Sequence, residues 1–171
     1  YEVDTRMAAE FSANDLKKYD LVVLHQLPSS KYLIQSVLDE INKQQIPKIF
    51  LTGYQTDLYA FNKAQTLLNI DYTGNRSPNE VTMIYNPGFN SFNTSDELRN
   101  KLGTFSPLLS PFGEYAASPS AQVLAYQKIG QVDTEFPLIL MGEANDIRTC
   151  IIAGEGIWKW RMREFADFNN T

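Results

Sequence analysis

Two short apolar runs, each followed by a helical pattern, place the strongest constraint on how this chain folds. Residues 21–24 (LVVL) and 49–51 (IFL) are continuous apolar stretches, as expected for strands buried on both faces of a parallel sheet. Residues 33–41 lie between them and repeat apolar side chains at helical spacing, and Asp57 is placed to cap a second helix that reaches Leu68. The order strand, helix, strand, helix predicts an α/β domain with parallel pairing.

The second half of the chain has a different pattern, richer in turns and strands. The segments predicted next are a polar loop (69–80), a strand (81–85), a helix (94–102) and a mostly irregular connection (106–120). Three β-rich stretches and a terminal helix follow, at residues 123–129, 137–141, 147–153 and 157–168. The turn-like sequence between the three stretches predicts that they pair in antiparallel fashion.

The size and composition fit one folded domain. The chain has 171 residues, of which 43% are hydrophobic and 20% charged, an ordinary globular composition with enough apolar residues for a full core. We expect residues 1–171 to form a single domain. Because the sequence starts without methionine and directly in strand-like residues, we also expect the domain to be a segment excised from a larger protein.

The charge and the rare residues exclude several functions. A net charge of −5 gives no electrostatic basis for binding nucleic acid. The single cysteine, Cys150, excludes an internal disulfide, and the single histidine, His25, leaves few options for a metal site. No apolar run approaches the roughly 18 residues of a membrane helix. We therefore expect no metal, no other cofactor, no nucleic-acid partner and no direct membrane insertion by this segment.

Two motifs carry a resemblance to a known superfamily. Residues 19–24 (YDLVVL) are similar to a strand of class I glutamine amidotransferases and the related ThuA-like proteins. Residues 47–55 (PKIFLTGYQ) are positioned like the strand that leads to the nucleophile of those enzymes. The resemblance covers most of the chain. It implies a flavodoxin-like three-layer sandwich with a mostly parallel central sheet and a C-terminal antiparallel β hairpin extension.

The same resemblance implies that the usual catalytic residues are missing. Active members have a cysteine nucleophile at the position of Thr52, on a sharp turn whose helix N-terminus stabilises the thiolate and the oxyanion. Their catalytic histidine, followed by Pro-Glu, ends the last hairpin strand, where this chain has AGEGIW at residues 153–158. A threonine hydroxyl needs an adjacent base to attack an amide. We therefore assign no catalytic residue and treat Thr52 as a degenerate nucleophile position.

A pocket can still exist where active members bind substrate. Ligands of open α/β sheets gather outside the carboxyl ends of the strands, which is where His25 is predicted to lie. Cys150 falls inside a predicted strand, so we interpret it as a packed core thiol. The possible pocket residues are His25, Gln26, Thr52, Gly53, Tyr54, Gln55 and Glu155.

The C-terminal run resembles a narrower group of proteins. Residues 154–161 (GEGIWKWR) are similar to the end of catalytically degenerate amidotransferase-like domains in larger bacterial membrane proteins. This resemblance implies a soluble domain of a membrane-anchored parent, on the cytoplasmic or the periplasmic side. Tryptophans two positions apart on a helix point in different directions, so at least one is expected to contact something besides the core. The possible interaction surface consists of Trp158, Trp160, Arg161 and Arg163.

These observations lead to one main hypothesis and two alternatives. The main hypothesis is a non-catalytic amidotransferase-like module for binding or assembly, whose partner is another domain of the parent, a separate protein or a small molecule. The first alternative is a divergent hydrolase that uses His25 with Thr52 or with a carboxylate such as Glu155. The second is a ThuA-like sugar-binding domain, which rests on fold analogy.

Overall fold

The computed structural model describes residues 2–72, 74 and 77–169. The domain is an α/β protein with a mixed seven-stranded sheet of order β1-β2-β9-β8-β7-β4-β5 and a separate two-stranded sheet, β3-β6. The helical elements are η1 (Ala13–Lys18), α1 (Gln35–Lys43), α2 (Leu58–Ala64), α3 (Asp96–Leu102) and α4 (Trp158–Asn169). The strands are β1 (Val22–His25), β2 (Lys48–Leu51), β3 (Leu68–Asp71), β4 (Asn79–Tyr85), β5 (Leu108–Ser110), β6 (Glu114–Ala117), β7 (Gln122–Ile129), β8 (Val132–Ala144) and β9 (Ile147–Ile152).

The expectation of a mostly parallel, flavodoxin-like sheet is wrong in its strand directions. Only β1–β2 and β2–β9 pair in parallel, whereas β9–β8, β8–β7, β7–β4 and β4–β5 are antiparallel. For the β8–β9 pair the cause is local. Asn145 and Asp146 join β8 to β9 and both have positive φ angles, as in the two-residue turns that fold a chain into an antiparallel hairpin.

Several local predictions are confirmed and others are wrong, including the polar loop over 69–80, whose two ends belong to strands β3 and β4. Asp57 caps α2 by accepting a hydrogen bond from the Ala60 amide, as expected. That helix ends at Ala64 instead of Leu68, because the buried Gln65 side chain bonds the backbone of residues 67 and 68 and starts strand β3. The connection over 106–120 contains strands β5 and β6, which pair with the distant strands β4 and β3.

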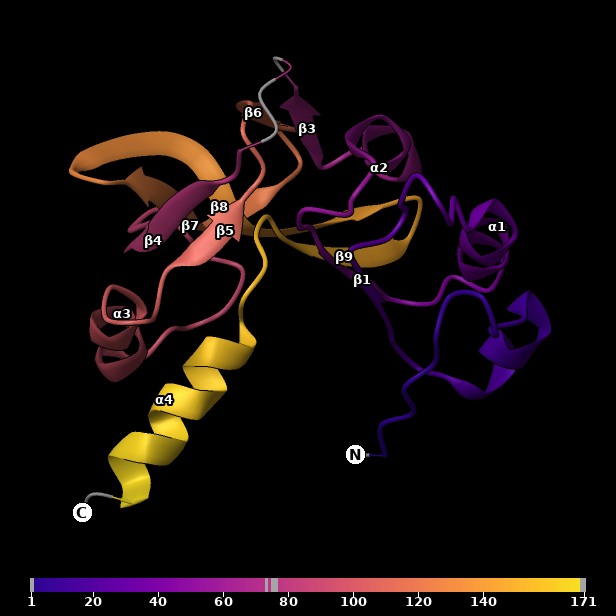
Figure 1. The fold of residues 1–171 in the computed structure, drawn as a ribbon, viewed down its shortest axis with the longest axis horizontal. Helices are drawn as coiled ribbons and strands as arrows, with labels where there is room; N and C mark the ends of the chain where they lie inside the picture. The colour runs from indigo at the N-terminus through magenta and orange to yellow at the C-terminus, as the bar shows by residue number, and fades with distance from the viewer. Residues whose placement is uncertain (1, 73, 75–76, 170–171) are drawn as a thin grey trace.

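The core consists of two buried clusters. The larger cluster packs η1, α1, α2 and the β3–β6 sheet against one part of the main sheet, and the Phe50 and Phe61 rings meet edge to face with centroids 5.4 Å apart. The second cluster packs α3 and the start of α4 against β4, β7 and β8. Figure 1 shows the result: α1 and α2 lie beside β1 and β9, whereas α3 and α4 lie at the other end of the molecule. No helix in the described ranges is long and apolar enough to cross a membrane.

Candidate functional site

The turn between β2 and α2 is the first candidate site, because it follows the carboxyl end of a central parallel strand. Thr52 opens this turn, and its amide donates to the Ile152 carbonyl at 3.0 Å, which extends the β2–β9 ladder by one residue. The Thr52 side chain is only 1% exposed. Its Oγ1 atom has no hydrogen-bond partner among the described residues. The hydroxyl is therefore sealed from solvent and has no base beside it.

Three successive backbone amides in this turn are each bonded to a side-chain oxygen. The Gly53 amide donates to Thr56 Oγ1 at 3.0 Å. The Tyr54 amide donates to Glu155 Oε2 at 3.2 Å, and the Gln55 amide donates to Gln26 Oε1 at 2.9 Å. Free amides at such a turn are the usual donors to an oxyanion. Here side chains of the protein itself accept the hydrogen bonds of all three amides, and we call this arrangement the capped turn.

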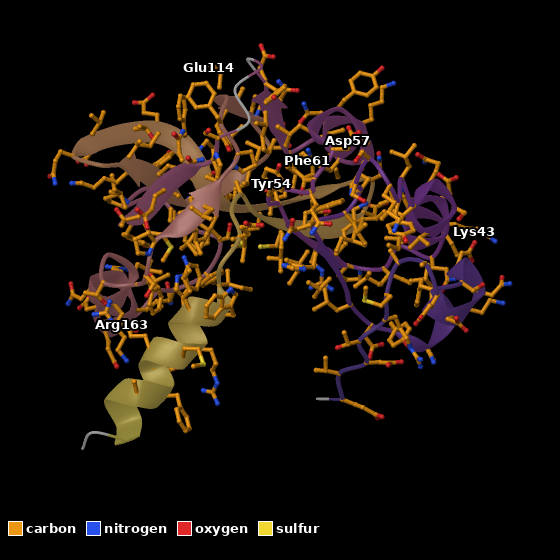
Figure 2. The ribbon with its side chains drawn as sticks, in the orientation of Figure 1. Lys43, Tyr54, Asp57, Phe61, Glu114 and Arg163 are labelled. Carbon is orange, nitrogen blue, oxygen red and sulfur yellow. The ribbon has the colours of Figure 1, made fainter. Side chains whose placement is uncertain are left out.

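Gly53 is required by the close approach of the capping side chains. A Cβ atom at this position would lie 2.4 Å from Glu155 Oε2 and 2.8 Å from Gln26 Cδ, far inside van der Waals contact. Any larger residue would therefore displace both caps. Figure 2 shows Tyr54 where the turn meets the segment that leads into α4, and its side chain is 71% exposed, so it fills no pocket.

Backbone pairing holds Glu155 in place. Its amide and carbonyl exchange hydrogen bonds with Leu109 at 2.9 and 3.0 Å, which joins the end of β9 to β5. Gly156 follows with a φ of +107°, a conformation that glycine adopts without strain. Gly154 packs close to Leu108, where an added Cβ would lie 3.1 Å from the Leu108 Cβ. The glycine pair thus forms a tight structural turn that aims Glu155 at Tyr54.

The structure separates the two residues that a hydrolase would need to combine. His25 ends β1, as predicted, and pairs with Leu51 in the sheet, so these two side chains lie on the same face. Thr52 follows Leu51 in the extended ladder, so its side chain points to the opposite face. His25 is exposed, and Thr52 is buried.

Of the predicted pocket residues, the structure therefore brings together Gln26, Gly53, Tyr54, Gln55 and Glu155, and it leaves the His25 and Thr52 side chains apart. Two members of the arrangement were not predicted from the sequence. Thr56 was detectable in kind, because threonine side chains in turns often bond neighbouring backbone groups. Leu109 carried no signal, since it contributes only its backbone and lies in a segment predicted to be irregular.

Cys150 lies inside strand β9, as predicted, with its side chain partly buried. Burial raises the pKa of its thiol to about 11, so the thiolate is scarce at neutral pH and the group is a poor nucleophile. No group of three or more His, Cys, Asp or Glu side chains within the described ranges is arranged to hold a metal ion.

The second candidate site is the helix α4, whose two tryptophans have different surroundings. Trp160 stacks on Phe105 with ring centroids 5.0 Å apart, and its Nε1 donates to the Ser106 carbonyl at 2.7 Å. Trp158 is 65% exposed. On the α3 side of α4, Arg163 donates to the Thr104 carbonyl (Figure 2). The side chains of Trp160 and Arg163 thus fix the helix to residues 104–106.

The charged residue Arg161 lies on the exposed part of α4 and makes a long ion pair, 3.8 Å, with Glu164. Such an exposed pair adds little stability. The four residues of the predicted interaction surface therefore divide into two that fix the helix and two, Trp158 and Arg161, that face solvent.

Comparison with known proteins identifies the fold and no more. No protein-family model matches the chain, and no curated protein matches its sequence. The structure is similar to that of a cytoplasmic protein from Salmonella typhimurium LT2, with a TM-score of 0.53 and 18% identity, covering 91% of this chain and 69% of that chain. It is also similar to a beta-galactosidase from Bacillus circulans sp. alkalophilus, with a TM-score of 0.47 and 9% identity, covering 92% of this chain and 24% of that chain.

Proposed function

We propose that this chain is a non-catalytic, amidotransferase-like module for binding or assembly within a larger, membrane-associated bacterial protein. The observation that supports it most directly is the capped turn. A glutamine amidotransferase would need free amides at this turn to stabilise an oxyanion, and Thr56, Glu155 and Gln26 accept hydrogen bonds from all three. The resemblance of residues 47–55 to the nucleophile strand supports the family assignment.

The geometry gives no support to the divergent-hydrolase alternative. A hydroxyl nucleophile needs a base within about 2.6–3.2 Å. Thr52 Oγ1 has no hydrogen-bond partner among the described residues, and His25 points to the other face of the sheet. Glu155 accepts a bond from the Tyr54 amide and makes none to the Thr52 hydroxyl.

Hydrolysis assays test the non-catalytic part of the proposal. The chain should release no more ammonia from glutamine, and no more product from an activated ester, than the Thr52→Val variant does. Valine keeps the shape of threonine and removes the hydroxyl, so it is a matched control for a buried site. Turnover that the wild-type chain shows and Thr52→Val lacks would establish catalysis at this turn and overturn the proposal.

The sugar-binding alternative would have to use a surface away from the capped turn. One shallow hollow of about 570 Å³ lies beside β4 and α3. Its charged groups already have partners: Arg99 bonds Thr94 and Asp96, and Lys128 pairs with Asp133. We therefore expect no shift in melting temperature with neutral sugars or polyols, and a saturable shift that Arg99→Ala removes would support this alternative.

A further inference from the structure

The main sheet ends at β1, whose outer edge has no partner among the described strands. The Val22 amide donates to the carbonyl of Pro47, directly before β2, at 3.0 Å. Because the backbone groups of successive residues point to opposite sides of a strand, the amides and carbonyls of Val23 and His25 point away from β2. An edge of this kind is a template for pairing with another strand.

The opposite edge of the sheet, at β5, is already covered. There, Leu109 exchanges backbone hydrogen bonds with Glu155 at 2.9 and 3.0 Å. At the β1 edge, by contrast, Leu21 and Val23 are 48% and 52% exposed. Exposed apolar strands at a sheet edge promote unwanted pairing, and folded proteins normally cover or charge them. The β1 edge is therefore the edge of the main sheet that needs a cover.

Residues 3–7 have the sequence pattern of a strand but lie in irregular backbone. Val3, Thr5 and Met7 alternate with the charged residues Asp4 and Arg6, which is the period-two pattern of a half-buried strand. All five residues are exposed, Val3 to 84% and Met7 to 69%. The segment thus carries a row of strand-forming side chains that lies mostly in solvent. We call residues 3–7 the strap.

Polar contacts hold the strap at the entrance to β1. Asp4 accepts a hydrogen bond from the Tyr19 hydroxyl at 2.5 Å and forms a long ion pair with Lys18 at 3.9 Å. Lys18 ends η1 and Tyr19 follows it, shortly before β1 begins at Val22. Figure 1 accordingly shows the N-terminal segment on the β1 side of the sheet, near η1. The strap is therefore tethered beside the uncovered edge.

The connection between the strap and β1 has the length that parallel pairing requires. Parallel neighbours need a crossover of about a dozen residues or more, and residues 8–21 supply it. Within this connection η1 runs over six residues. At about 2.0 Å per residue it returns the chain by about 12 Å, close to the roughly 13 Å that four strand residues span. The strap can therefore run parallel to β1 with η1 left in place.

The face on which η1 lies is also the correct one. Crossovers between parallel strands of one sheet are nearly always right-handed. The crossovers from the strap to β1 and from β1 to β2 proceed across the sheet in the same direction, so their helices must cover the same face. Leu16 of η1 and Ile41 of α1 are both fully buried in the larger cluster, together with Leu24 and Phe50 of the sheet. Both helices thus meet this requirement.

We propose that the strap pairs in parallel with the outer edge of β1 and closes it. The pairing gives the outward backbone groups of Val23 and His25 their partners and extends the main sheet by one strand. The structure shows the strap open, tethered by Asp4 and poised to close. This inference goes beyond the proposed function, and it would apply to a catalytic and a non-catalytic domain alike.

The tether sets the face that each row of the closed strap takes. The Tyr19 ring lies 6.3 Å, centroid to centroid, from Phe11, which packs against the larger cluster. Because Asp4 bonds Tyr19, the charged row of the strap is directed to the side of η1. The row of Val3, Thr5 and Met7 then lies on the other face, next to Leu21 and Val23. Closure therefore removes apolar surface from water on the strap and on β1 together.

Amide hydrogen exchange measured by NMR tests the strap, because it reports individual backbone bonds. The Val23 and His25 amides should exchange at least about tenfold more slowly in the wild-type chain than in the double variant Thr5→Pro, Arg6→Pro. Proline lacks the amide, and at two adjacent positions one of the missing amides must face β1. The control variant Thr5→Val, Arg6→Lys keeps both amides and should retain the protection. The Val22 amide, which bonds the β2 side, should be protected equally in all three chains and so verifies that the sheet is intact.

A second readout identifies the segment that covers the edge. In the wild-type chain, NOEs should connect the backbone of residues 4–6 to that of residues 21–23, and they should be absent in the double proline variant. The protection of Val23 and His25 should also be independent of protein concentration, because the strap belongs to the same chain.

Three results would overturn the inference. They are fast exchange of the Val23 and His25 amides in the wild-type chain, protection that persists in the double proline variant, and protection that rises with protein concentration. The last result would assign the β1 edge to a second copy of the chain. None of them bears on the hydrolysis assays, so failure of the strap and failure of the non-catalytic assignment can be told apart.

Discussion

The carboxylate of Glu155 accepts a hydrogen bond from the backbone amide of Tyr54, which lies 101 positions earlier in the chain. The bond joins the end of β9 to the turn after β2, and it is one of three hydrogen bonds that occupy the successive amides of that turn.

Removal of the Glu155 cap should destabilise the domain modestly. Glu155→Ala leaves the Tyr54 amide without its acceptor, and we expect a loss of about 1 kcal/mol in the free energy of unfolding. Glu155→Gln keeps an acceptor oxygen and should lose less. Urea unfolding at neutral pH measures both, and the exposed Glu10→Ala variant, expected within about 0.5 kcal/mol of wild type, is the control. Equal stability of Glu155→Ala and Glu10→Ala would show that the cap is unimportant.

Addition of one methyl group at Gly53 should cost more than removal of either cap alone. The new Cβ would push away both Glu155 and Gln26, so we expect Gly53→Ala to lose about 1–3 kcal/mol of stability. Gly103→Ala is the matched control, because nothing lies within 4 Å of its added Cβ and its φ is −68°. That variant should be neutral or slightly stabilising. Combining Gly53→Ala with Glu155→Ala should cost less than the sum of the two single changes, since one clash disappears.

The two tryptophans of α4 should differ sharply in their effect on monomer stability. Trp160→Ala removes the stacking on Phe105 and the bond to Ser106, so we expect a loss of about 2–4 kcal/mol, which is centred lower than the range for a fully buried tryptophan. Trp158→Ala should change monomer stability by less than about 0.5 kcal/mol, because its side chain is mostly in water. Urea unfolding compares them, and a larger loss for Trp158→Ala would contradict the assignment of the two faces.

The free energy of unfolding should decline at alkaline pH, because two buried side chains, Tyr115 and Cys150, are held in their neutral forms. Burial raises the pKa of Tyr115 from 10.0 to about 12 and that of Cys150 from 9.0 to about 11. In each case the unfolded chain loses its proton at a lower pH than the folded chain does. The stability that each group contributes is therefore complete below its unfolded pKa and is lost as pH rises towards its folded pKa, by up to about 3 kcal/mol per group.

Unfolding free energies measured between pH 8 and pH 12 test this decline. Cys150→Ala should flatten the curve between pH 9 and 11, and Tyr115→Phe should flatten it between pH 10 and 12. Tyr115→Phe should also be less stable at pH 8, because the phenol bonds Ser110. An unchanged slope in both variants would contradict the stated causes.

The sequence was sufficient for the elements that depend on neighbouring residues. The strands β1 and β2, the Asp57 cap and the C-terminal hairpins were all predictable, because periodicity and turn chemistry are local. The expected burial of residues 21–24 on both faces was wrong, since Leu21 is 48% and Val23 52% exposed. Strands β5 and β6 were missed because they are short, lie among prolines and are stabilised by pairing with β4 and β3. The direction of most of the sheet was misjudged because the resemblance gave the two parallel strand–helix units too much weight.

The candidate site was predictable as a location but not as a structure. Residues 52–55 were placed at the right turn, and the absence of a cysteine and a histidine there was visible in the sequence. The sequence did not predict that Glu155 and Gln26 accept hydrogen bonds from the turn, because each of them follows the end of a different strand. Only the fold brings these two side chains within hydrogen-bond distance of the turn amides.

The position of β9 between β2 and β8 also bears on how the domain is made. β9 pairs with β8 through a two-residue turn, but its parallel partner β2 is synthesised about 100 residues earlier. Closing so large a loop is entropically costly, whereas the β7–β8–β9 meander needs only short loops. We expect the C-terminal meander to form first and to provide the edge on which β2 and then β1 assemble. During synthesis on the ribosome, β1 and β2 would therefore join the sheet only after β9, the last of the described strands, has been made.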